Sequence, residues 1–140
     1  CNAKQNIEKQ NMKHKGSVCD FSADRNEELR KLFKEELMKQ ENRSTSEAMD
    51  KVWQSGASRF YVSETRVKAV MRYRKKHGNF PVMGASRLRM FRELWKRYTE
   101  KSRLFPKREE EDVIYEIVNS PAPSFYLTRR SLRTLLYNIL

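Results

Sequence analysis

Cysteine and histidine are scarce in this chain, and their positions exclude several classes of protein. The two cysteines, Cys1 and Cys19, both lie in the polar N-terminal segment, so they cannot staple a core, and this usage fits a reducing cytoplasm. The two histidines, His14 and His77, show no metal-ligand spacing with the cysteines, and neither a CxxC nor an HExxH motif is present. We therefore expect no metal and no other cofactor.

Glycine, proline and apolar runs are also few. Only four glycines and four prolines occur among 140 residues, which argues against a turn-rich β protein and favours an all-α fold. No apolar run approaches the roughly 18 residues of a membrane span, so we expect a soluble, cytoplasmic protein. The sequence contains no phosphate-binding glycine loop, and no histidine lies near Tyr61 or Tyr126 in sequence. These absences argue against an enzyme.

One short phrase occurs twice in the chain. SGASRFYVS, at residues 55–63, returns as SPAPSFYLT at residues 120–128, a shift of 65 residues. Ser, Ala, Phe and Tyr match at equivalent places, and the flanking residues are similar in character. A self-similarity of this length at one shift indicates an internal duplication.

Two duplicated three-helix units would account for most of the chain. We expect a flexible polar segment at 1–21, unit one at 22–78 and unit two at 79–140. The first helix is expected to begin at Asp24, with Glu27 as the partner in a capping box. Apolar periodicity predicts the other helices after Ser86 and over residues 46–54, 64–77, 109–119 and 129–140.

The repeated phrase has the features of a joint before the third helix of each unit. Its last residue is a hydroxyl side chain suited to an N-cap, and the aromatic pair before it supplies an apolar anchor and a half-buried tyrosine. In an alternative interpretation, the aromatic pairs are exposed platforms on which bases stack. We assign structural roles to Phe60, Tyr61, Ser63, Phe125, Tyr126 and Thr128.

The excess of positive charge is confined to one third of the chain. The net charge is +12, yet residues 58–108 alone carry +13, from 16 basic and 3 acidic residues. Ten of these 16 are arginines, which suit forked contacts with phosphate better than a general solubility surface. A polyanion that neutralises this charge explains the concentration more simply than a merely solvated face.

We therefore predict a basic patch for nucleic acid, with DNA favoured over RNA. Spacings of three or four residues put two trios on the solvent faces of their helices, where they would form one continuous patch: Lys68, Arg72 and Lys76, with Arg89, Arg92 and Lys96. The three-helix units loosely resemble helix-turn-helix domains, although the connection before the third helix is longer than usual. The complete set of candidate nucleic-acid-binding residues is Arg66, Lys68, Arg72, Lys75, Lys76, Arg87, Arg89, Arg92, Lys96, Arg130 and Arg133.

The pattern S-x-A-x-x-F-Y-[VL]-[ST], present in both copies of the phrase, resembles a motif in small, basic, uncharacterised proteins of Bacteroidetes and their mobile elements. This resemblance implies a habitat, but no activity and no site residues. Three functions stay open on the sequence: a non-catalytic nucleic-acid-binding protein, a structural or adaptor protein of a mobile element or phage particle with an acidic partner, and a surface lipoprotein that begins at Cys1. We favour the first.

Overall fold

The computed structural model describes residues 18–39 and 44–138, and this part of the chain is all-α, as expected. A single isolated bridge is its only β pairing. None of the described helices is long and apolar enough to cross a membrane. The helices are α2 (Val18–Leu37), α3 (Thr45–Trp53), α4 (Glu64–His77), α5 (Ala85–Leu104), α6 (Glu110–Val118) and α7 (Arg129–Tyr137).

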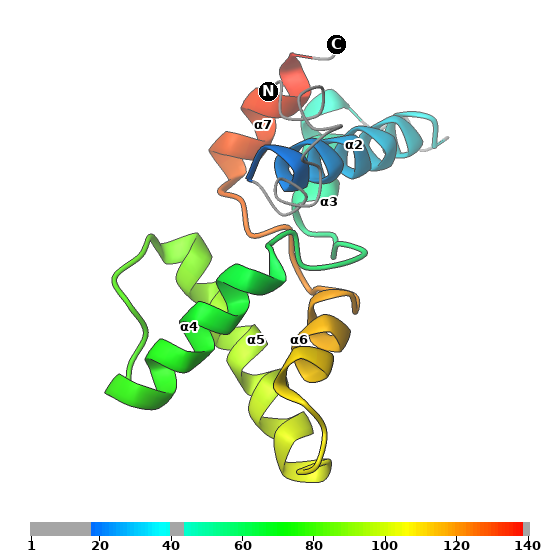
Figure 1. Ribbon diagram of the computed structural model, residues 1–140. Helices are drawn as coiled ribbons and strands as arrows, with labels where there is room; N and C mark the ends of the chain where they lie inside the picture. The colour runs from blue at the N-terminus through cyan, green and yellow to red at the C-terminus, as the bar shows by residue number, and fades with distance from the viewer. Residues whose placement is uncertain (1–17, 40–43, 139–140) are drawn as a thin grey trace, which may run out of the picture.

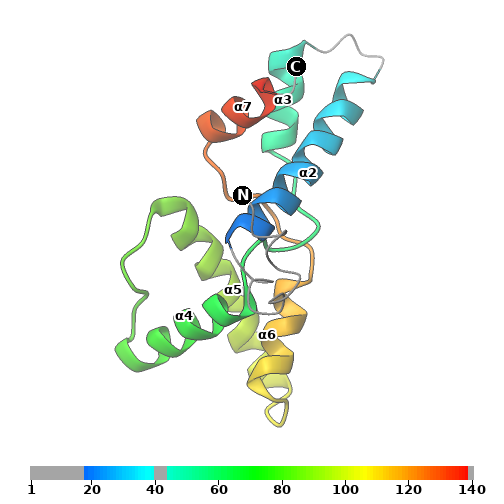
Figure 2. The same cartoon turned by 45° about the horizontal axis from the view of Figure 1, so that its top comes forward.

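The helices form two lobes of three (Figures 1 and 2). Lobe A contains α2, α3 and α7, and lobe B contains α4, α5 and α6. The buried apolar side chains of both lobes and of the connections between them form one core cluster, to which every helix contributes at least two residues. Each lobe therefore draws its helices from both halves of the chain.

This grouping differs from the predicted units at 22–78 and 79–140. The third helix of each unit, α4 or α7, packs mainly on the first two helices of the other unit. The helices that follow one another across the phrase are therefore not the packed neighbours of a helix-turn-helix motif. Because the two halves of the sequence are alike, the apolar face of either third helix suits either pair of partners, and local patterning does not choose between them. The duplication itself stays a prediction.

The two copies of the phrase cross between the lobes. The backbone N–H of Ala57 donates to the carbonyl of Ala122, and that of Ala122 donates to Ala57, both at 2.9 Å. A third backbone bond, from Phe60 N–H to the carbonyl of Val118, lies beside them at 3.0 Å. The two connections, residues 55–63 and 120–128, thus lie side by side, and each leads from one lobe to a helix of the other lobe (Figure 1). We call this pair of segments the crossing.

The aromatic pairs of the phrase pack against one another across this crossing. Phe60 and Phe125 are 1% and 6% exposed, which confirms these two rings as core anchors and argues against exposed platforms at the phenylalanines, whereas Tyr61 and Tyr126 are half-buried. The ring of Phe60 stacks with that of Tyr126 at 6.1 Å between centroids, and Tyr61 stacks with Phe125 at 6.3 Å. Each stacked pair therefore takes one ring from each copy of the phrase.

Tyr61 also has the polar contact expected of a half-buried tyrosine. Its hydroxyl donates to the carboxylate of Glu28, which additionally accepts from the backbone N–H of Ser58 at 3.0 Å. Burial and the contact with Glu28 raise the pKa of Tyr61 to about 12. This network ties the first connection to α2.

The start of the first helix was predicted wrongly. Helix α2 begins at Val18, so Asp24 and Glu27 lie inside it and form no capping box. No glycine or proline lies between Val18 and Leu37, so nothing in the sequence forces a later start. Residues 18–21, assigned to a flexible segment, are helical, and residues 1–17 of that segment lie outside the described part of the chain.

The other helix limits follow the sequence closely. Helix α4 spans the predicted residues, and Gly78 ends it with the left-handed φ of 78° that glycine adopts readily. A capping box does occur, but on α3, where Ser44 and Glu47 exchange hydrogen bonds. Helix α7 is described as far as Tyr137, and the last two residues of its predicted range lie outside the described part.

The two predicted N-caps are confirmed. Ser63 Oγ accepts from the backbone N–H of Arg66, and Thr128 Oγ1 accepts from that of Ser131, both at 3.0 Å. We expect Ser63→Ala and Thr128→Ala each to lower the free energy of unfolding by about 1 kcal/mol, because each leaves a helix N–H without its acceptor. Urea unfolding would measure this. Ser63→Asn and Thr128→Ser are the conservative controls, because both keep a side chain that can cap the helix. If Ser63→Ala or Thr128→Ala were as stable as the wild type, the cap at that position would not contribute to stability.

Candidate nucleic-acid interface

The basic ridge predicted on α4 faces an acidic partner inside the protein. Lys68 Nζ lies 2.6 Å from Glu111, and Arg72 lies 3.0 Å from Glu110, on the first turn of α6. Hydrogen bonding by Lys68 lowers the pKa of Glu111, which keeps the pair charged. Two members of the first trio therefore meet α6, and their positive charge is largely compensated. Arg72 and Lys76 are exposed, as the spacing predicts, whereas Lys68 is only partly exposed, so the first trio is on the solvent side of α4 but two of its charges have internal partners.

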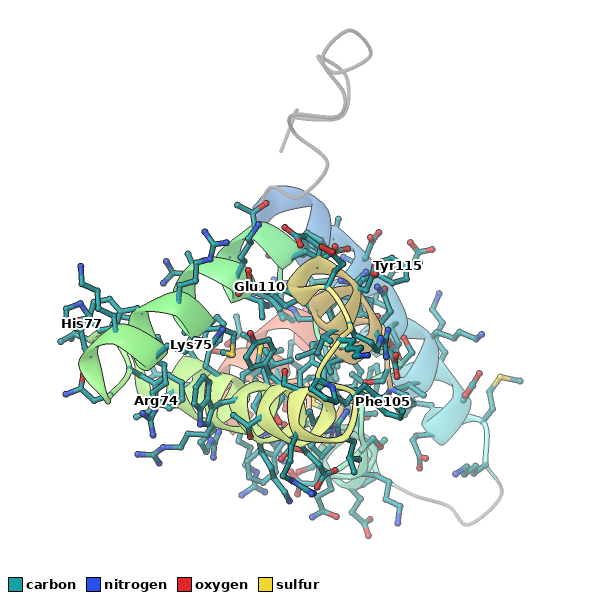
Figure 3. The ribbon with its side chains drawn as sticks, turned by 60° about the horizontal axis from the view of Figure 1, so that its bottom comes forward. Arg74, Lys75, His77, Phe105, Glu110 and Tyr115 are labelled. Carbon is teal, nitrogen blue, oxygen red and sulfur yellow. The ribbon has the colours of Figure 1, made fainter. Side chains whose placement is uncertain are left out.

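Lys75 and Arg74 are also engaged. Lys75 Nζ donates to the Tyr98 hydroxyl at 2.6 Å and lies 3.7 Å from Glu110, and the bond to Tyr98 raises its pKa. The Arg74 guanidinium lies over the Trp95 ring, 4.9 Å from its centroid. Figure 3 shows Arg74, Lys75 and Glu110 on neighbouring parts of lobe B. These cations hold α4 against α5 and α6, so their first role is structural.

On α7, one candidate residue is paired with a carboxylate within the protein and the other is exposed. Arg133 lies 2.6 Å from Asp50 of α3, and Arg129 lies 2.7 Å from the same carboxylate. Hydrogen bonds from Arg129 and Arg133 lower the pKa of Asp50. Arg133 therefore fastens α7 to α3, and Arg130 is exposed.

The second trio is arranged as the spacing predicts. Arg89, Arg92 and Lys96 are all exposed on α5, and within the described part of the chain their side chains make neither a hydrogen bond nor an ion pair. We call these three residues the α5 basic face. They line an open groove with the second copy of the phrase, at Ser124 and Tyr126.

The groove contains one carboxylate, and that carboxylate is already paired. Glu93 lines the groove but lies 2.8 Å from Arg97, one turn further along α5. Arg97 in turn donates to the carbonyl of Pro121 at 2.8 Å. The Glu93–Arg97 pair therefore fixes the crossing segment to α5, while the charge of the α5 basic face stays uncompensated.

The remaining candidates lie on either side of this groove. Arg66, at the start of α4, and Arg87, at the start of α5, line a second cavity that shares Ser124 and Tyr126 with the groove. Lys76 is exposed in the last turn of α4. The structure thus brings five of the candidates around the second copy of the phrase: Arg66, Arg87, Arg89, Arg92 and Lys96.

Sequence reasoning missed two features of this region. Arg25 of α2 lines the same cavity as Arg66 and Arg87, and burial lowers its pKa. No signal in the sequence links Arg25 to those residues, since they meet only because the connections cross. The second feature is the neutralisation of Lys68 and Arg72 by Glu111 and Glu110. The sequence shows that these glutamates lie at the start of a predicted helix, but it does not show which cations they pair with, because that depends on where α4 packs.

The fold and this surface define an all-α protein of two three-helix lobes, each built from both halves of the chain, with a basic helix in lobe B. Among the described residues, no group of three or more histidine, cysteine, aspartate or glutamate side chains is placed to hold a metal ion. Comparison with protein-family models, with curated proteins and with solved structures finds no match to this chain. The resemblance to proteins of Bacteroidetes and their mobile elements therefore stays a prediction from the repeated phrase.

Proposed function

We propose that the protein binds nucleic acid, DNA in preference to RNA, through the α5 basic face, in the cytoplasm and without catalysing a reaction. The observation that carries the proposal is the set of three exposed cations on one face of α5 that have no partner among the described residues, although other cations of the patch do. Carboxylates within the protein neutralise the charges of Lys68, Arg72 and Arg133, but not the charges of the α5 basic face. These three charges are therefore available to bind an external anion.

The spacing of the three cations suits a phosphate backbone. Residues 89 to 96 cover about 10 Å of helix at 1.5 Å per residue. One strand of DNA presents roughly three phosphates over that length, at about 3.4 Å of axis per charge. Arg89 and Arg92 can each make forked contacts with phosphate oxygens, and Lys96 adds a point charge. These contacts read the backbone, so we expect little sequence preference.

The test is a triple variant, Arg89→Gln, Arg92→Gln and Lys96→Gln, in a mobility-shift titration with unrelated DNA at several salt concentrations. We expect affinity at low salt to fall by more than about tenfold, and the slope of log affinity against log salt to shrink by up to about three. Each lost phosphate contact removes about one counterion release, which is the reason for the change in slope.

The matched control removes three cations from a different surface. Arg30, Lys31 and Lys34 are exposed on α2, in lobe A. The triple change of these residues to Gln lowers the net charge equally, and we expect it to leave affinity within about twofold. A triple variant of the α5 basic face with wild-type affinity and slope would instead favour an adaptor that binds an acidic protein.

A further inference from the structure

A cavity of about 400 Å³ lies where the two lobes meet the crossing. Its walls come from the start of α2, the first copy of the phrase, the starts of α4 and α5, and the second copy of the phrase. This volume falls in the range of pockets for small organic ligands. Apolar side chains, among them Phe21, Met90, Phe91 and Phe125, form a large part of its lining.

The charged side chains of this cavity all have the same sign. Arg25, Arg66 and Arg87 reach it from three different helices, and no aspartate or glutamate is among the described residues that line it. Within the described part of the chain, the side chains of Arg66 and Arg87 make neither a hydrogen bond nor an ion pair. Arg25 donates only to its neighbour Asn26, at 3.1 Å. Three arginines without an acid favour a ligand that carries negative charge.

The hydroxyl and aromatic side chains of the cavity indicate which groups a ligand would carry besides its negative charge. Ser63 and Ser124 line the cavity, and Ser63 caps α4, whose N-terminal end attracts anions. Tyr61 and Tyr126 line it too, each stacked on a phenylalanine. Aromatic and apolar walls beside cations suit a flat ring attached to an anionic group.

Tyr126 is the residue that joins this cavity to the groove of the α5 basic face. It lines both, and its φ of 55° is a left-handed value that a non-glycine residue rarely adopts, because it strains the backbone. Its hydroxyl has no hydrogen-bond partner among the described residues. A strained aromatic residue with an uncommitted hydroxyl, placed between two basic sites, is typical of a ligand contact.

We infer that this cavity binds a nucleoside monophosphate unit, with the phosphate on Arg66 and Arg87 and the base against the aromatic walls. Two sources supply this chemistry: a free mononucleotide, or an unpaired nucleotide of a strand that lies on the α5 basic face. The second source rests on the proposed function, since the groove and the cavity share Ser124 and Tyr126.

The first experiment uses adenosine 5′-monophosphate and isothermal titration calorimetry on the full chain. We expect saturable binding that is at least tenfold tighter than that of adenosine or of inorganic phosphate, since each lacks half of the contacts. The double variant Arg66→Gln and Arg87→Gln should weaken it by at least tenfold. Arg30→Gln with Lys34→Gln removes the same charge from exposed positions on α2 and should leave it within twofold. Equal losses in both double variants would overturn a specific phosphate site.

The second experiment separates the two sources. A blunt DNA hairpin is compared with the same hairpin carrying a three-nucleotide single-stranded overhang. A preference of at least fivefold for the overhang that disappears in the Arg66 and Arg87 variant supports an unpaired nucleotide of a strand. Binding of the mononucleotide without such a preference supports the free nucleotide. The inference is overturned if neither ligand shows a contribution from the two arginines.

The α5 basic face variant distinguishes this inference from the proposed function. Arg89, Arg92 and Lys96 do not line the cavity, so their replacement should weaken blunt DNA but not the mononucleotide. If the protein binds the mononucleotide but does not bind blunt DNA, the proposed function is refuted and the cavity assignment stands. DNA binding that depends on the α5 basic face, without any nucleotide contribution from the cavity, would refute the cavity assignment alone.

Discussion

Replacing Phe60 or Phe125 by alanine is expected to lower the free energy of unfolding by about 3 to 5 kcal/mol, the usual cost of emptying a buried aromatic site. Both rings are almost fully buried, and each stacks on a tyrosine from the other copy of the phrase. Phe60 also lies under the guanidinium of Arg97, 4.9 Å from its ring centroid. Each substitution therefore removes apolar burial and a ring contact that joins the two connections.

Urea unfolding followed by circular dichroism measures this effect. Phe105→Ala provides the control, because Phe105 is 49% exposed and the same truncation there opens no core cavity. We expect that variant to stay within about 0.5 kcal/mol of the wild type. If Phe60→Ala and Phe125→Ala were as stable as Phe105→Ala, the rings would not be core anchors, and their assignment as stacking platforms would return.

The second large effect is expected at Gly56. A Cβ atom added to Gly56 would lie 2.6 Å from the carbonyl oxygen of Ala122, closer than real Cβ contacts. That same oxygen accepts the hydrogen bond from Ala57, so the crossing segments would have to move apart. We expect Gly56→Ser to destabilise the protein by about 2 to 3 kcal/mol, from overpacking and the weakened backbone bonds.

Gly84→Ser is the matched substitution. A Cβ at Gly84 meets nothing within 4 Å, and Gly84 occupies the N-cap of α5, where it offers no side-chain bond. Serine there should leave stability unchanged or raise it by a few tenths of a kcal/mol. Thermal unfolding of the two variants side by side gives the comparison. Equal melting temperatures for Gly56→Ser and Gly84→Ser would show that the connections do not need their close approach.

The crossing also has a functional consequence. Arg25 belongs to lobe A, whereas Arg66 and Arg87 belong to lobe B, and the cavity between them exists only while the lobes keep their places. The α5 basic face lies within lobe B alone. A destabilised crossing should therefore disturb the cavity lined by Arg25, Arg66 and Arg87 before it disturbs the α5 basic face.

The sequence by itself determined the local structure. Ser63 and Thr128 cap their helices and Gly78 ends α4, because each of these outcomes depends on neighbours a few residues away. The solvent exposure of the α5 basic face followed from helical spacing for the same reason. The sequence also indicated that Phe60 and Phe125 are buried, although their ring partners come from the other copy of the phrase. The start of α2 was the exception, since a good capping pair inside a longer helix is not distinguished from one at its end.

The tertiary structure decided which helices pack together, and with that decision it determined the site. The two connections pair at Ala57 and Ala122, and beyond them α4 packs on α5 and α6 while α7 packs on α2 and α3, a choice that local patterning does not specify. Once α4 lies on α6, Glu110 and Glu111 compensate Arg72 and Lys68, while Arg89, Arg92 and Lys96 on α5 stay uncompensated. Charge along a sequence adds up residue by residue, but its compensation depends on contacts between distant segments, and only the packed lobes supply those.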